Sequence, residues 1–212
     1  MCAKSQSDYQ MNNREERLRR LRELEEKTRA KCEEIAKKYF PKDKYKVTGV
    51  YPMITAEGKP VCIINFRRLT YEAPVDCYEL CERLVPWGEE EKYDECVSEC
   101  EDNLKLITTN SVEVDPETLE VKSSSVAGSC HPIMPEPEEE EEEFEKRREE
   151  FYKSFEKIGC ELKEGWIHPH ELARGTVGVE IEEEPVTCFY HIKSKNGGCK
   201  LPDVLRLVEE KF

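Results

Sequence analysis

The chain has 212 residues, a length that fits one large domain or two small ones. Acidic residues outnumber basic ones by 47 to 33, and the formal net charge of −14 repels nucleic-acid phosphates and anionic membrane surfaces. No stretch approaches the roughly 18 apolar residues of a membrane-spanning helix, and residues 1–10 lack a signal-peptide run. We therefore expect a soluble protein without a membrane span or direct nucleic-acid contact.

Cysteine is unusually frequent in this chain. There are 11 cysteines, more than a mesophile's cytosolic protein usually keeps, and the odd count leaves one thiol over. Gln occurs twice and Asn six times whereas Glu and Lys are abundant, a composition typical of thermostable proteins. We expect an oxidising compartment such as the mitochondrial intermembrane space, or the cytoplasm of a hyperthermophile or a virion. We also expect disulfides, more than large cores, to support the fold.

The first half of the chain predicts a long helix followed by a β-hairpin. Residues 12–40 place apolar side chains on one stripe, which fits a helix packed on a sheet or a coiled coil with a partner. The segments "YKVTGVYPMI" (45–54) and "PVCIINFRRLTY" (60–71) flank a turn at Gly58 and are typical of paired strands. Two helices and two strands should follow, over 72–85, about 90–103, 104–111 and 112–124.

The segment 123–143 differs in character from the sequence on either side. It has small residues, three prolines and a run of glutamates, a composition typical of a linker. A helix over 144–162, two strands within 176–195 and a terminal helix follow it. We therefore predict an α+β protein with antiparallel sheets. Its two small helix-strand-strand-helix units would span 1–122 and 144–212.

Cysteine positions suggest that the second unit repeats the first. Cys32 lies on the predicted long helix and Cys62 on a strand, 30 residues apart, while Cys160 and Cys188 hold comparable places 28 residues apart. These four cysteines are candidates for further disulfides. An internal duplication and a chance similarity of plan both explain the pattern.

The stretch "CYELCERLVPWGEEEKYDECVSEC" (77–100) carries two cysteine pairs of identical internal spacing. Residues four apart lie on one face of a helix, so each pair forms a row along its helix. Two such helices folded antiparallel bring the outer cysteines together and the inner ones together. The predicted disulfides are Cys77–Cys100 and Cys81–Cys96. A structural zinc site built from the four thiolates is the alternative.

This arrangement resembles the twin CX3C hairpin of the small Tim chaperones of the mitochondrial intermembrane space. The resemblance covers 24 of the 212 residues. It implies a protein that is oxidised on import and escorts or scaffolds hydrophobic partners, with the same four cysteines at the matching positions. Those chaperones are short and all-helical, whereas this chain places the hairpin between predicted strands.

Two other patterns are candidates for chemistry. Glu120 and Lys122 have the E-x-K form found at the metal site of PD-(D/E)xK nucleases, with Asp115 and Asp102 as acids to test. The chain has four histidines, His131, His168, His170 and His191. A mixed Cys/His metal site is a second interpretation, because His168 and His170 would share one side of an extended segment and two residues separate Cys188 from His191, in a C-x2-H spacing. Surface or turn positions explain the histidines better, because residues 188 and 191 of a strand face opposite ways.

These features together favour an interaction protein over an enzyme. We expect a non-enzymatic, acidic, disulfide-stabilised interaction or structural component of a larger assembly, viral or from a hyperthermophile. Its partner should be a basic protein or another copy of the chain, and we expect no cofactor and no metal. A divergent metal-dependent nuclease and an acidic inhibitor that mimics nucleic acid are the alternative hypotheses.

Overall fold

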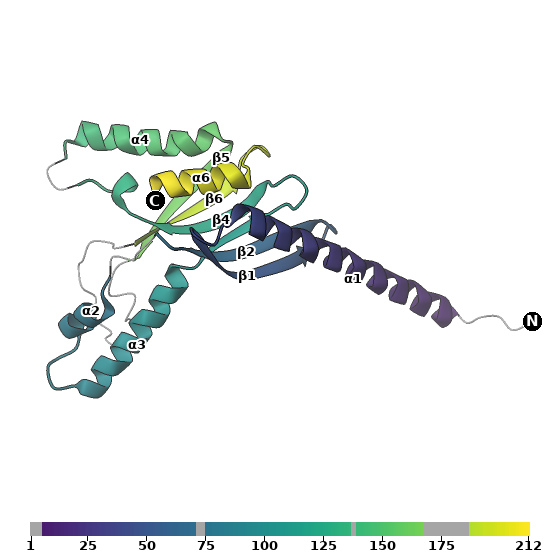
Figure 1. Cartoon of the computed structure of the whole chain (residues 1–212), viewed down its shortest axis with the longest axis horizontal. Helices are drawn as coiled ribbons and strands as arrows, with labels where there is room; N and C mark the ends of the chain where they lie inside the picture. Colours follow the sequence, from purple (N-terminus) through teal and green to yellow (C-terminus); the bar gives the residue numbers. More distant parts are fainter. Residues whose placement is uncertain (1–5, 71–74, 137–138, 168–186) are drawn as a thin grey trace, which may run out of the picture.

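The computed structural model describes residues 6–70, 75–136, 139–167 and 187–212 and has an α+β fold (Figure 1). The helices are α1 (Gln6–Tyr39), α2 (Cys77–Leu84), α3 (Glu90–Ile107), the 3-10 helix η1 (His131–Ile133), α4 (Glu141–Lys157) and α6 (Leu201–Lys211). The strands are β1 (Tyr45–Ile54), β2 (Pro60–Arg68), β3 (Asn110–Val114), β4 (Val121–Gly128), β5 (Cys160–Ile167) and β6 (Thr187–Ser194). The predicted fold class is confirmed.

All six of these strands form one antiparallel sheet in the order β1-β2-β3-β4-β6-β5. This arrangement corrects the prediction of separate units joined by a linker at 123–143, because the first residues of that segment belong to the central strand β4. Its serines fit a strand: Ser124 is buried and donates to the carbonyl of Ser111 at 2.9 Å. The sequence predicted strand structure only as far as residue 124, because the small side chains that follow are typical of a linker, whereas β4 continues to Gly128.

Helices α1, α4 and α6 cover one face of the sheet. Their apolar side chains join those of the strands in a single cluster of 24 buried residues, so both predicted units share one core. Helix α1 contributes only its C-terminal half, and its first half extends beyond the sheet with Leu18 and Leu21 exposed (Figure 1). The sheet body therefore has a substantial hydrophobic core, contrary to the expectation of small cores.

Two polar side chains connect the helices to the sheet. Glu209 on α6 accepts hydrogen bonds from Lys44 Nζ at 2.6 Å and from Tyr45 Oη at 2.7 Å. Burial raises the pKa of Glu209, but the two donors lower it by more, so the net pKa lies below its ordinary value. The buried Arg68 donates to backbone carbonyls of β4 and α6 at 2.7 and 3.2 Å.

Two predicted helix boundaries were wrong. Helix α3 runs to Ile107, into the segment expected to begin a strand at 104, and β3 starts only at Asn110. Helix α4 ends at Lys157 because Gly159 has a φ of +75°, a left-handed conformation that commonly terminates helices. Cys160 consequently lies on β5 and not on a helix.

Five disulfides link the described cysteines, which fits an oxidising environment. Cys32–Cys62 joins α1 to β2, as the candidate positions suggested. The bridges of the second half are Cys130–Cys188 and Cys160–Cys199. Cys160 and Cys188 are therefore not bonded to each other as Cys32 and Cys62 are, and the disulfides do not follow the internal repeat that the cysteine spacing suggested. The remaining cysteine, Cys2, lies outside the described residues.

Candidate interaction site on the stapled hairpin

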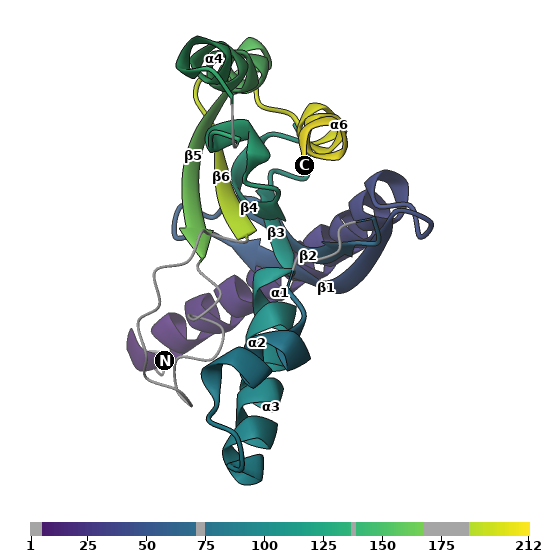
Figure 2. The same ribbon diagram turned by 90° about the vertical axis from the view of Figure 1, so that its left-hand side faces the viewer.

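Helices α2 and α3 form a hairpin that extends away from the sheet (Figures 1 and 2). Asp76 caps α2, because its carboxylate accepts hydrogen bonds from the N–H groups of Tyr78 and Glu79 at 2.9 and 3.4 Å. Pro86 follows the end of α2, and Gly88 turns the chain with a φ of +94°. Acidic residues then open α3, where the helix dipole favours negative charge.

Disulfide-bonded cysteines are most of the buried residues between the two helices of the hairpin. The bridges Cys77–Cys100 and Cys81–Cys96 have Cα separations of 5.7 and 5.9 Å, and they confirm the pairing predicted from the spacing. The hairpin has its own cluster of seven buried residues, and these four cysteines are the majority of it. A zinc site would need four thiolates, which the bridges do not leave. The staple holds the two helices together with few apolar contacts.

The surface of the hairpin is strongly acidic. Residues 76–105 include 11 Asp or Glu against 3 Lys or Arg, a net of −8 out of the −14 of the whole chain. Burial, followed by the charges of Glu82 and other groups of the hairpin, raises the pKa of Tyr93. Negative charge is therefore concentrated on the hairpin, which projects from the sheet (Figure 1).

The tip of the hairpin carries a fully exposed tryptophan. Trp87 has a relative exposure of 103%, whereas large apolar side chains normally bury most of their surface. Beside it lies a groove of about 470 Å³, with an apolar and aromatic part from Pro86 and Tyr93 and an acidic part from Glu82 and Glu90. The tip thus presents an indole and carboxylates together to solvent.

The residues of the nuclease hypothesis make other contacts. Asp102 lies on α3 and pairs with Lys105 at 3.0 Å. Asp115 accepts two backbone hydrogen bonds in the turn between β3 and β4, and Glu120 pairs with Lys122 at 2.6 Å. The turn does bring Asp115 and Glu120 together in space, because the backbone N–H of Asp115 donates to the carbonyl of Glu120 at 2.9 Å.

The histidines and acidic side chains do not form a metal site in the part of the chain that the structure describes. That part holds no group of three or more His, Cys, Asp or Glu that could bind a metal. His131 lies 3.2 Å from Glu136, and His191 is exposed on β6. His168 and His170 lie outside the described residues.

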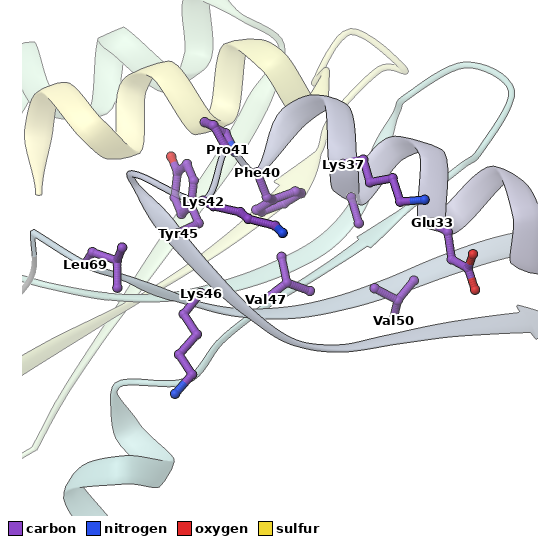
Figure 3. Close-up of a pocket in the computed structure, with 11 residues that line it drawn as sticks. Glu33, Lys37, Phe40, Pro41, Lys42, Tyr45, Lys46, Val47, Val50 and Leu69 are labelled. Atoms are coloured by element: carbon purple, nitrogen blue, oxygen red, sulfur yellow. The ribbon is translucent and has the colours of Figure 1, made fainter.

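The sequence placed Trp87 in the turn but did not identify it as a candidate binding residue. Proline and glycine on either side of it indicate a turn, but they do not show whether the indole packs on a helix or stays in water. A second hollow, the α1–β1 groove, lies where the end of α1 crosses β1 (Figure 3). No sequence pattern indicated it, since its two walls come from separate elements.

None of the described helices is both long enough and apolar enough to cross a membrane. Comparison of the chain with family models, with curated proteins and with solved structures found no match.

Proposed function

We propose that the protein is a non-enzymatic interaction component of a larger assembly and that its hairpin tip binds a basic partner protein. The observation that carries this proposal is the full exposure of Trp87 beside a groove lined by glutamates. Tryptophan is enriched among the residues that dominate protein interfaces, because its large rigid surface gains much from burial. An indole that is exposed in the free protein can be buried against a partner, and this burial would stabilise the complex.

The chemistry around Trp87 favours a lysine or arginine of the partner. A cation over the indole face gains from the ring quadrupole, and the neighbouring Glu82 and Glu90 add electrostatic attraction. The net charge of −8 on residues 76–105 would also accelerate the encounter with a basic surface. Disulfides support this role because a stapled tip loses little conformational freedom on binding.

The proposed setting is an oxidising one, in which the five disulfides persist. The mitochondrial intermembrane space and the interior of a hyperthermophile or its virus both meet this requirement. The scarcity of Gln and Asn supports the second setting.

Affinity capture with matched variants tests the proposal. Immobilised full-length protein, Trp87→Ala and Tyr78→Ala would be exposed to a source extract and the bound proteins quantified by mass spectrometry. Tyr78 is the control because it is 57% exposed on the same hairpin but does not line the groove. We expect a basic protein that wild type and Tyr78→Ala retain, that Trp87→Ala loses, and that high salt releases.

The same experiment distinguishes the proposal from nucleic-acid mimicry. Partners that Trp87→Ala retains, and that added duplex DNA displaces, would support the acidic-inhibitor hypothesis instead. Identical partners with all three proteins and no effect of salt would contradict both proposals.

A further inference from the structure

The α1–β1 groove is a second candidate binding site, separate from the hairpin. It has a volume of about 660 Å³, within the usual range of small-molecule sites. It forms where α1 crosses the outer strand, and β1 carries an irregularity between Val47 and Gly49 at this point. Such a bulge bends a strand and increases its twist, which leaves space between helix and sheet edge.

The floor of the groove is apolar. Phe40 and Tyr45 line it from the core, and Val47 and Val50 line it from the strand side (Figure 3). Both valines are only half-buried, and Leu69 at one end is 52% exposed. The apolar lining is therefore partly open to solvent at the two valines and at Leu69, while Phe40 and Tyr45 are each only 3% exposed. Grooves with apolar walls and a few polar groups are common sites for small ligands.

Charged side chains surround this apolar floor, and three lysines (Lys37, Lys42 and Lys46) outnumber one glutamate, Glu33. Lys37 and Lys42 lie on the helix side of the groove, and Figure 3 shows the Lys42 side chain extending across it beside Phe40. Neither lysine forms an ion pair with a described residue, although nearby Lys44 pairs with Glu209 at 2.6 Å. In a chain with 14 more acidic than basic residues, these positive charges over an apolar floor form a complementary site for an anion.

We propose that the α1–β1 groove binds a long-chain fatty acid, with the alkyl chain on Phe40, Val47 and Val50 and the carboxylate beside Lys37 and Lys42. The apolar lining suits an alkyl chain, and the net positive charge of the lining suits its carboxylate. This inference is independent of the hairpin tip. It assigns a ligand to a surface that the protein-binding proposal does not use.

The edge of the sheet is less suited to a peptide strand. The bulge, Pro52 and Lys46 lie along β1, and each of these features discourages the addition of a further strand. Nucleic acid is also a poor candidate, because the overall charge of −14 repels phosphates. A fatty acid needs no strand pairing, and its single negative charge is repelled far less than a phosphate backbone with many charges.

Titration of the delipidated full-length protein with palmitate, below its micelle concentration, tests the proposal by displacement of a fluorescent fatty acid. We expect saturable binding at one site per chain. Joint replacement Lys37→Gln and Lys42→Gln should weaken it about tenfold, since charge-assisted contacts are lost. Lys38→Gln is the matched control, because this neighbouring lysine of α1 does not line the groove and should leave the affinity unchanged.

Two further arms separate head-group from chain recognition. Hexadecanol should bind more weakly than palmitate and should be insensitive to the lysine variant, and Val50→Glu should abolish palmitate binding. Thermal midpoints confirm that each variant is folded, and the lysine variant still tests the proposal if Val50→Glu unfolds. The absence of saturable palmitate binding, or equal affinity in every variant, would overturn the proposal. So would binding of an acidic amphipathic peptide that palmitate does not displace.

Discussion

Replacing the four hairpin cysteines with serine should unfold the hairpin and leave the sheet body folded. The four sulfurs belong to a cluster of seven buried residues that is separate from the main core, so their removal leaves only three buried apolar side chains there. In the chain-entropy account, closing the outer loop of 23 residues is worth about 3.4 kcal/mol, and the inner bridge adds to this. Without either bridge, three buried and four partly buried side chains must hold the two helices together, and a hairpin of this size usually needs a crosslink to remain folded.

Hydrogen exchange measured by mass spectrometry resolves this local effect. Amides of α2 and α3 should exchange like those of an unfolded chain in the four-serine variant, while β2, β3 and α6 keep their protection. The matched control replaces Cys32 and Cys62, whose bridge lies inside the main core. That change should lower the free energy of global unfolding and leave the hairpin protected. Unchanged protection of α2 and α3 without their disulfides would refute the reasoning.

Two further substitutions test the sheet body. Glu209→Gln should lower the free energy of unfolding at pH 7 by up to about 1 kcal/mol, because the negative charge that attracts its two donors, Lys44 and Tyr45, is removed from a partly exposed side chain. Because the pKa of Glu209 is lower in the folded than in the unfolded protein, its ionised carboxylate stabilises the fold at pH values above the unfolded-state pKa. This stabilisation is lost as the pH falls through the folded-state pKa. Urea unfolding should therefore separate this variant from wild type at pH 7 and not at pH 2.5, and Glu210→Gln should show a smaller difference. Gly159→Ala should lower the free energy of unfolding by about 1 to 2 kcal/mol, because φ is +75° and the new Cβ would lie 3.0 Å from Gly198. Gly165→Ala is the control, since its Cβ would meet nothing within 4 Å, and it should lower the free energy by less. Thermal unfolding measures both.

The prediction for the hairpin succeeded because the necessary information is local. Two CX3C pairs on short helices joined by a tight link leave one antiparallel arrangement that brings all four sulfurs into bonding distance. The edge hairpin β1–β2 was predicted for a similar reason, since hydrophobic strands flank a glycine turn. Neither prediction required knowledge of the rest of the chain.

The exposure of individual tip residues was less visible from the sequence. Tryptophan in a turn can fold back on a helix or remain in water, and only the structure shows Trp87 exposed beside the acidic groove. The α1–β1 groove is likewise a product of tertiary packing. Its floor combines a helix end with a bulged strand, and neither segment has an unusual composition.

Local sequence thus determined the stapled hairpin, the acidic charge and most helices, because spacing, capping and periodicity act over a few residues. Tertiary structure decided that β4 is a central strand, and that Cys188 pairs with Cys130 while Cys160 pairs with Cys199. The physical reason is the distance along the chain: β4 gains its hydrogen bonds from β3 on one side and from β6, some 60 residues later, on the other. A serine-rich segment becomes a strand only when those partners are in place.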